Sequence, residues 1–120
     1  MKTHKDLKVW NNSINFVTKV YTITNDFPKE ELFSITSQIR RAAVSIASNI
    51  AEGAARTSKK EFLNFLSIAL GSASELETQI IISKNLNYIK LEDYNIFINE
   101  LNEIQKMIHG LMNNLKSTNH

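Results

Sequence analysis

The chain has 120 residues, a length that suits one domain with one core. Three glycines and one proline are too few for a turn-rich β-sandwich or a disordered chain. The lack of cysteine excludes disulfides, thiolate metal sites and a cysteine nucleophile. Residues 1–10 lack the apolar core of a signal peptide, so we expect a cytoplasmic protein without a membrane span.

The net charge is only +2, but basic residues are concentrated in the first half of the chain. Residues 1–60 carry ten Lys or Arg and five Asp or Glu, whereas residues 61–120 carry four and seven. This asymmetry indicates either a basic surface for nucleic acid or two solvated faces of opposite sign that attract each other within the fold or an oligomer.

The first predicted helix covers residues 6–24 and ends before Pro28, which lacks an amide hydrogen and restricts the residue before it. Two apolar sets follow the spacing of a helix. The first set is Leu7, Trp10, Ile14, Val17 and Tyr21; the second is Val9, Phe16, Val20 and Ile23.

The second predicted helix covers residues 29–52, and Gly53 fits its end in a left-handed conformation. Its centre is rich in Ala and Ser, which lets a neighbouring helix approach closely. The predicted apolar face comprises Phe33 or Leu32, Ile35, Ile39, Ala42, Ala43, Ile46 and Ile50.

The third predicted helix covers residues 58–86, and Ser58 with Glu61 predicts a capping box at its start. Gly71 costs about 1 kcal/mol relative to Ala inside a helix, which favours a close helix crossing there. The predicted core stripe is Phe62, Leu66, Ala69, Ala73, Leu76 and Ile80.

The fourth predicted helix covers residues 91–115. It has a regular alternation of apolar spacings at Tyr94, Phe97, Leu101, Ile104, Ile108, Leu111 and Leu115. Four long helices with short links predict an all-α, antiparallel up-down-up-down four-helix bundle, formed as a single domain by residues 1–120.

Helices one and three carry more apolar residues than one core face needs, which predicts a homo-oligomer. We expect Val9, Phe16, Phe65 or Ile68 to contribute to a subunit interface.

Residues for catalysis or metal binding do not converge in this sequence. None of the three His residues has a partner at metal-ligand spacing, and the three glycines form no phosphate-binding loop. We therefore predict no enzyme activity, no metal and no cofactor.

A row of polar residues predicts a polar seam on one side of the second helix, made of Arg41, Ser45, Asn49 and Glu52. Antiparallel pairing with the third helix places Arg41 near the level of Glu75, so we expect an Arg41–Glu75 ion pair between helices or between subunits. The seam either recognises a ligand or forms a structural hydrogen-bond network.

The basic residues Arg40, Arg56, Lys59 and Lys60 are predicted to form a rim that contacts nucleic-acid phosphates without sequence preference. The competing interpretation is that Glu92, Asp93 or Glu100 of a neighbouring subunit neutralises this rim.

Two stretches resemble the bacterial four-helix-bundle proteins of 23S rRNA intervening sequences, which are related to accessory proteins of diversity-generating retroelements. They are Gln38-Ile39-Arg40-Arg41-Ala42-Ala43 with Ser45-Ile46-Ala47-Ser48-Asn49-Ile50-Ala51-Glu52-Gly53, and Ser58, Glu61-Phe62, Phe65-Leu66, Ile68-Ala69, Gly71-Ser72 and Glu75-Leu76-Glu77-Thr78-Gln79. The opening Asp6-Leu7-Lys8-Val9-Trp10 is similar too.

The resemblance implies a four-helix bundle that assembles as a ring, usually a pentamer. Family members are encoded in insertions within rRNA genes. The related accessory proteins are strongly basic and are thought to bind nucleic acid and a reverse transcriptase, whereas this chain has a net charge of +2. Two functions remain open: a homo-oligomer that contacts RNA or DNA phosphates, and a structural or partner-binding bundle without a nucleic-acid role.

Overall fold

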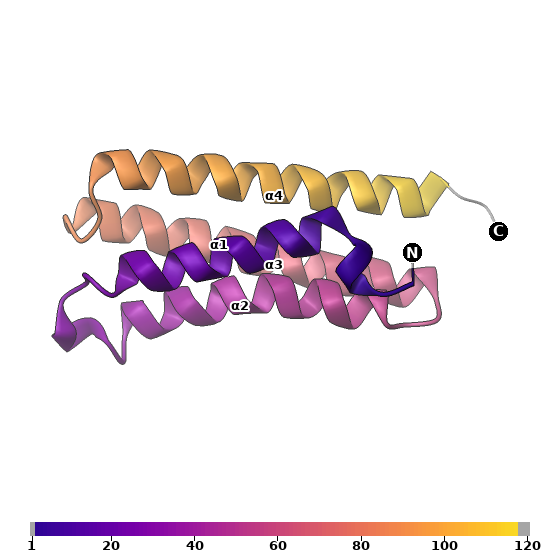
Figure 1. The fold of residues 1–120 in the computed structure, drawn as a ribbon, viewed down its shortest axis with the longest axis horizontal. Coiled ribbons are helices and arrows are strands. Elements are labelled where there is room, and N and C mark those ends of the chain that lie inside the picture. The colour runs from indigo at the N-terminus through magenta and orange to yellow at the C-terminus, as the bar shows by residue number, and fades with distance from the viewer. Residues whose placement is uncertain (1, 118–120) are drawn as a thin grey trace.

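Four α-helices make up most of the computed structural model, which describes residues 2–117. They are α1 (Lys8–Thr24), α2 (Ile35–Ala54), α3 (Lys59–Asn85) and α4 (Leu91–Ser117). Two short 3₁₀ helices, η1 (His4–Asp6) and η2 (Lys29–Glu31), precede α1 and α2. The helices run alternately in opposite directions along a bundle 50 Å long (Figure 1). The predicted all-α four-helix bundle is confirmed.

Side-chain contacts fix the antiparallel register of neighbouring helices. Ser45 Oγ of α2 lies 2.8 Å from Ser72 Oγ of α3. Between α1 and α4, the ammonium of Lys19 lies 2.7 Å from a carboxylate oxygen of Glu100. Within the described chain each helix packs against its two neighbours, and α2 and α4 lie diagonally opposite each other, with α1 and α3 between them (Figure 1).

The start of α2 differs from the prediction, since the helix begins at Ile35 rather than residue 29. Pro28 is followed by the short η2, and Ser34 then has a non-helical backbone (φ −125°, ψ −108°). Phe33 therefore lies outside the helical register and is 92% exposed, which corrects its predicted place on the apolar face.

Gly53 lies inside α2 and is buried, so its predicted left-handed helix end is wrong. A Cβ atom added at this position would lie 2.8 Å from Phe65 Cβ and 2.9 Å from Phe62 Cδ1. The glycine therefore permits the close approach of α2 and α3 next to their connecting turn. Ser58 caps α3 as predicted, its Oγ accepting a hydrogen bond from the Glu61 amide at 3.1 Å.

The predicted core stripes of α3 and α4 are confirmed, but the core face of α1 is not the first apolar set. The buried residues of α1 are Val9, Ser13, Phe16, Val20 and Thr24. The two hydroxyl groups bond back to the carbonyls of their own helix, Ser13 to Val9 at 2.8 Å and Thr24 to Val20 at 2.7 Å. Because these groups are satisfied locally, two polar residues share a stripe with the core.

Two of the four residues predicted at a subunit interface lie in the core of the single chain instead. Val9 is 4% exposed and Phe16 is 1% exposed, because they belong to the buried face of α1. Phe65 is half-buried, and Ile68 is 45% exposed on α3. Of the predicted set, Phe65 and Ile68 are thus the residues that remain available to a partner.

The surface of α3 is apolar on several sides. Among the described helices, α3 is the one whose length and composition would let it cross a bilayer, and a third of its most apolar window is buried within the bundle. Apolar helices from the core of soluble proteins have the same length and composition. The predicted close crossing at Gly71 does not occur among residues 2–117, since a Cβ there would meet nothing within 4 Å.

Candidate functional site

The four basic residues predicted to form one rim occupy two places. Arg40 lies near the end of α1, where its Nε donates to Thr24 Oγ1 at 2.9 Å and its Nη2 donates to Asn25 Oδ1 at 3.1 Å. Its guanidinium also lies 4.7 Å from the centre of the Tyr21 ring. Sixteen residues of helix rise separate it from Arg56, roughly 24 Å. Arg40 therefore ties α2 to α1 and is not part of the Arg56 cluster.

The other three basic residues meet at the turn between α2 and α3. Arg56 stacks on Phe65, with 4.9 Å between the guanidinium carbon and the ring centre, and lies 3.5 Å from Glu52. Lys59 starts α3, and Lys60 is exposed beside it. The stacking orients Arg56, and its ion pair is solvent-exposed and therefore weak.

The fold brings further lysines to the same end of the bundle. The N-terminal segment lies at the end that also holds the α2–α3 turn and the last turn of α4 (Figure 1). We call residues 2–8, 52–61 and 115–117 the basic end. It contains seven basic and three acidic residues, for a net charge of +4. The basic residues are Lys2, Lys5, Lys8, Arg56, Lys59, Lys60 and Lys116.

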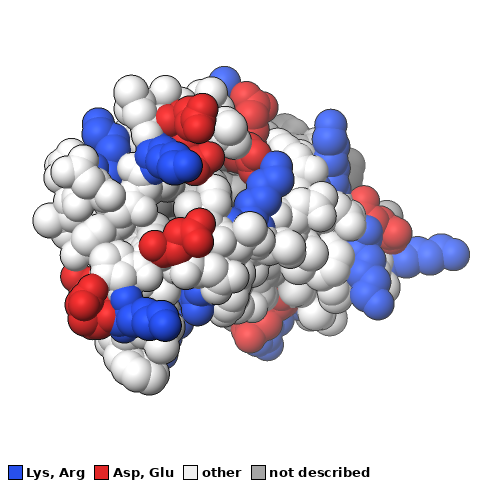
Figure 2. All heavy atoms as spheres, turned by 60° about the vertical axis from the view of Figure 1, so that its left-hand side comes forward, with Lys and Arg blue, Asp and Glu red and all other residues white. Residues whose placement is uncertain are grey.

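The opposite end of the bundle has the opposite sign. We call residues 25–34 and 84–93 the acidic end; it contains three Lys and five Asp or Glu, for a net charge of −2. In Figure 2 this end comes forward with charges of both signs interspersed, whereas blue predominates towards the far end. The bundle is therefore polarised in charge along its long axis.

A hydrogen bond fastens the two connections at the acidic end. The Tyr88 hydroxyl donates to Glu31 at 2.7 Å, and the Tyr88 ring packs against Phe27 with 5.6 Å between ring centres. The pKa of Glu31 is held below its ordinary value, chiefly by the Ser34 hydroxyl and then by Tyr88. The same hydrogen bond raises the pKa of Tyr88.

The predicted polar seam is present in part as a network between α2 and α3. Besides the Ser45–Ser72 contact, Asn49 Nδ2 donates to the Ser45 carbonyl at 2.8 Å and to Ser45 Oγ at 3.0 Å. Glu52 instead pairs with Arg56 along its own helix. Of these contacts, the Ser45–Ser72 contact crosses from α2 to α3, and the Asn49 bonds stay within α2. They favour the structural interpretation of the seam.

Arg41 and Glu75 form no ion pair with each other within the described chain, so the predicted buried pair between α2 and α3 is wrong. Both residues are exposed. They line one surface hollow of about 560 Å³ together with Tyr21, Val44 and Ser45. The other half of the prediction, a pair across a subunit boundary, remains a prediction.

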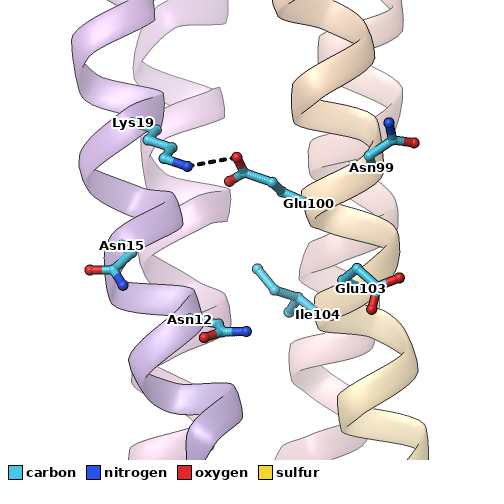
Figure 3. Close-up of a pocket in the computed structure, with 7 residues that line it drawn as sticks. All are labelled: Asn12, Asn15, Lys19, Asn99, Glu100, Glu103 and Ile104. Atoms are coloured by element: carbon cyan, nitrogen blue, oxygen red, sulfur yellow. Dashed lines mark hydrogen bonds and ion pairs between the residues drawn. The ribbon is translucent and has the colours of Figure 1, made fainter.

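A second concave surface lies between α1 and α4. One hollow of about 360 Å³ is lined by Asn12, Asn15, Lys19, Asn99, Glu100, Glu103 and Ile104. Figure 3 shows Asn12 and Ile104 projecting into the gap, with the Lys19–Glu100 ion pair crossing it. A second hollow of about 370 Å³ continues past Lys19 to Ile23, Asp93 and Ile96. We call the two together the α1–α4 groove.

Residues that could hold a metal ion do not cluster in the described part of the chain. The polar groups that line the α1–α4 groove are three amides, two threonine hydroxyls, the Lys19–Glu100 ion pair and two further carboxylates. The hydroxyls of Thr18 and Thr22 donate to carbonyls of their own helix, those of Ile14 and Thr18.

The model of one protein family, described as 23S rRNA-intervening sequence protein, matches residues 5–110. The chain belongs to this family. The match covers most of the chain and includes both stretches on which the resemblance rests.

A solved structure supports the assignment of the family and its fold. It is a protein of unknown function from the S23 ribosomal protein family of Bacteroides thetaiotaomicron VPI-5482. The two share 29% sequence identity and a TM-score of 0.81, over 88% of this chain and 95% of the other. Among curated proteins, nothing matches this chain. Neither the family description nor the neighbour indicates a catalytic activity.

Proposed function

We propose that this protein is a non-enzymatic, self-associating bundle whose basic end contacts the phosphates of nucleic acid. The observation that carries the proposal is the charge polarity of the bundle, +4 at one end and −2 at the other. Lys5, Lys8 and Lys60 are exposed at the basic end. Clustered, solvent-exposed lysines attract a polyanion without reading its sequence.

Self-association is supported by apolar side chains on the outside of the bundle. Val44 is 40% exposed, Ile68 45%, Ile82 44% and Ile96 53%. Single exposed apolar residues are ordinary; these four, on α2, α3 and α4, offer places where another copy could pack. Several copies would also place several basic ends on one polyanion, which raises avidity without new contacts.

Fluorescence titration of labelled single-stranded RNA and duplex DNA tests the nucleic-acid proposal. We expect binding at low salt with little sequence preference. On duplex, log K should fall against log salt with a slope of about −0.9 for each phosphate contact. The triple variant Arg56→Ala, Lys59→Ala, Lys60→Ala should bind more weakly and with a shallower slope. No binding at tens of micromolar protein, or unchanged binding by the triple variant, would overturn the proposal.

The alternative function, a structural or partner-binding bundle, is favoured by the contacts of two basic residues. Arg40 bonds to Thr24 and Asn25, and Arg56 pairs with Glu52, so neither needs a phosphate to satisfy its charge. In this case the partner is a protein, for which the family resemblance suggests a reverse transcriptase. Failure of the titration together with specific capture of such an enzyme would support this alternative.

A further inference from the structure

Buried polar residues gather in the core at the acidic end of the bundle. Thr24 ends α1, and Thr36 lies in the first turn of α2. Gln79 and Ser83 lie in the last two turns of α3. All four residues are exposed by 8% or less, and Ser13 is the other buried polar residue of the described chain. The core is therefore partly polar in its last layer at this end.

Two of these four residues are satisfied, whereas two have a buried atom without a partner. Thr24 Oγ1 donates to a carbonyl of its own helix at 2.7 Å and accepts from Arg40 Nε at 2.9 Å. Ser83 Oγ donates to a carbonyl of its own helix at 2.9 Å. Thr36 Oγ1 and Gln79 Oε1 are buried and form no hydrogen bond with the described residues. A buried polar atom that has lost its hydration without gaining a partner destabilises the closed structure.

The start of α2 lies at the same end and lacks a side-chain cap. Its N-cap residue, Ser34, donates its hydroxyl to Glu31 and does not accept from an amide of the first turn. An N-cap side chain normally stabilises that first turn. The turn of α2 that contains Thr36 is therefore weakly held from both sides, by its missing cap and by its unpartnered hydroxyl.

One contact joins the two connections at this end, and we call it the Tyr88–Glu31 latch. The Tyr88 hydroxyl donates to the Glu31 carboxylate at 2.7 Å, and the Tyr88 ring packs against Phe27. Phe27 and Ile89, one from each connection, are each 7% exposed and belong to the core. Separation of the two connections would bring both apolar side chains into water.

We propose that the acidic end opens locally, in a transition that separates the two connections at the Tyr88–Glu31 latch while the rest of the bundle stays folded. Proteins open first where buried contacts and helix ends are least stabilised. In the open state water hydrates the two unpartnered polar atoms, and Phe27 and Ile89 become accessible. The bundle thus presents an apolar surface opposite its basic end only while it is open. This inference does not depend on nucleic-acid binding.

The competing arrangement is a bound water that bridges Thr36 Oγ1 and Gln79 Oε1. The two residues lie at a similar level of the bundle, since Thr36 precedes Ser45 by nine residues and Gln79 follows Ser72, the contact of Ser45, by seven. A bridging water would satisfy both atoms and stabilise the closed end. Replacing the Thr36 hydroxyl by a methyl group separates the two arrangements, because the hydroxyl destabilises the closed end in one and stabilises it in the other.

Hydrogen–deuterium exchange of the full chain, followed by NMR, measures the opening. We compare helical amides near the acidic end, in residues 20–24, 38–42 and 78–84, with those near the basic end, in residues 48–52 and 62–66. In wild type the first group should exchange faster than the second, because opening of the acidic end exposes it without global unfolding.

Three variants test the cause of the opening. Thr36→Val should slow exchange of the acidic-end amides about tenfold, because it removes a buried hydroxyl without a partner. Thr24→Val is the matched control: it removes a hydroxyl that accepts from Arg40, and should speed the same exchange. Tyr88→Phe should speed it about fivefold and leave the basic-end amides unchanged. Circular dichroism checks that each variant is folded.

Each contrary outcome overturns the proposal. Equal exchange at both ends of wild type would mean that the acidic end is not the weaker one. Faster exchange in Thr36→Val would mean that a bound water satisfies its hydroxyl in the closed end. Slower exchange in Thr24→Val as well would mean that the missing partner of Thr36 is irrelevant. Equal acceleration at both ends in Tyr88→Phe would mean that the chain unfolds as a whole.

Discussion

Two glycines of this fold differ in how closely other side chains approach them. Gly53 lies where the Cβ atom and ring of α3 aromatic side chains approach the backbone, and a methyl group there has no room. Gly110 lies on α4 with no atom within 4 Å of its missing Cβ. The packing around each glycine, rather than its position in the sequence, determines what it contributes.

We predict opposite effects for two glycine-to-alanine changes. Gly53→Ala should lower the free energy of unfolding by about 1–3 kcal/mol, because Phe65 Cβ is fixed to the backbone and cannot move aside. Gly110→Ala should raise it by about 1 kcal/mol through helix propensity. Urea denaturation measures both, and a Gly53→Ala variant as stable as wild type would contradict the proposed close approach.

A second prediction concerns the pH dependence of the stability that the Glu31 carboxylate contributes. Its folded-state pKa lies below its ordinary value, so the charged form adds stability above the unfolded pKa. That stability is lost as pH falls through the folded pKa. The melting temperature of wild type should therefore exceed that of Glu31→Gln by more at pH 7 than at pH 3. An equal difference in melting temperature at both pH values would refute the contribution of charged Glu31 to stability. The same difference for the neighbouring Glu30→Gln variant would refute it too.

At the scale of helices, apolar periodicity predicted the core stripe of α4, whose buried positions are all apolar, and that of α3, where six apolar positions are buried beside Gln79 and Ser83. It failed for α1, whose buried stripe includes Ser13 and Thr24, hydroxyl residues satisfied by their own helix. The predicted start of α2 at residue 29 was also wrong, because Pro28 is followed by the separate short helix η2. Apolar spacing alone does not predict the hydrogen bonds that let Ser13 and Thr24 be buried.

The α1–α4 pair should be held together only weakly by charge. Lys19 and Glu100 are 55% and 29% exposed, so their ion pair is largely screened. A double-mutant cycle with Lys19→Met and Glu100→Gln should give a coupling below about 1 kcal/mol that shrinks further in 0.5 M salt. A coupling of several kcal/mol, insensitive to salt, would mean that this pair rather than core packing closes the groove.

At the scale of the whole molecule, the sequence revealed only part of the basic end. Arg56, Lys59 and Lys60 were grouped correctly because they are neighbours in the chain. Lys5 and Lys8 were missed, although an antiparallel bundle places the start of helix one beside the end of helix two. Arg40 was wrongly grouped with Arg56, because a count of basic residues takes no account of the roughly 24 Å of helix between them. The concave surfaces could not be predicted, since they depend on how side chains from two helices meet.

The most direct test of the proposed function compares equal charge changes at opposite ends of the bundle. Lys5→Gln with Lys60→Gln removes two charges from the basic end, and Lys29→Gln with Lys90→Gln removes two from the acidic end; all four side chains are exposed. The salt dependence of RNA binding is then measured for both double variants. Our account predicts weaker binding and a shallower salt slope for the first variant, and tighter or unchanged binding for the second. Equal losses in both variants, or no loss in either, would contradict it.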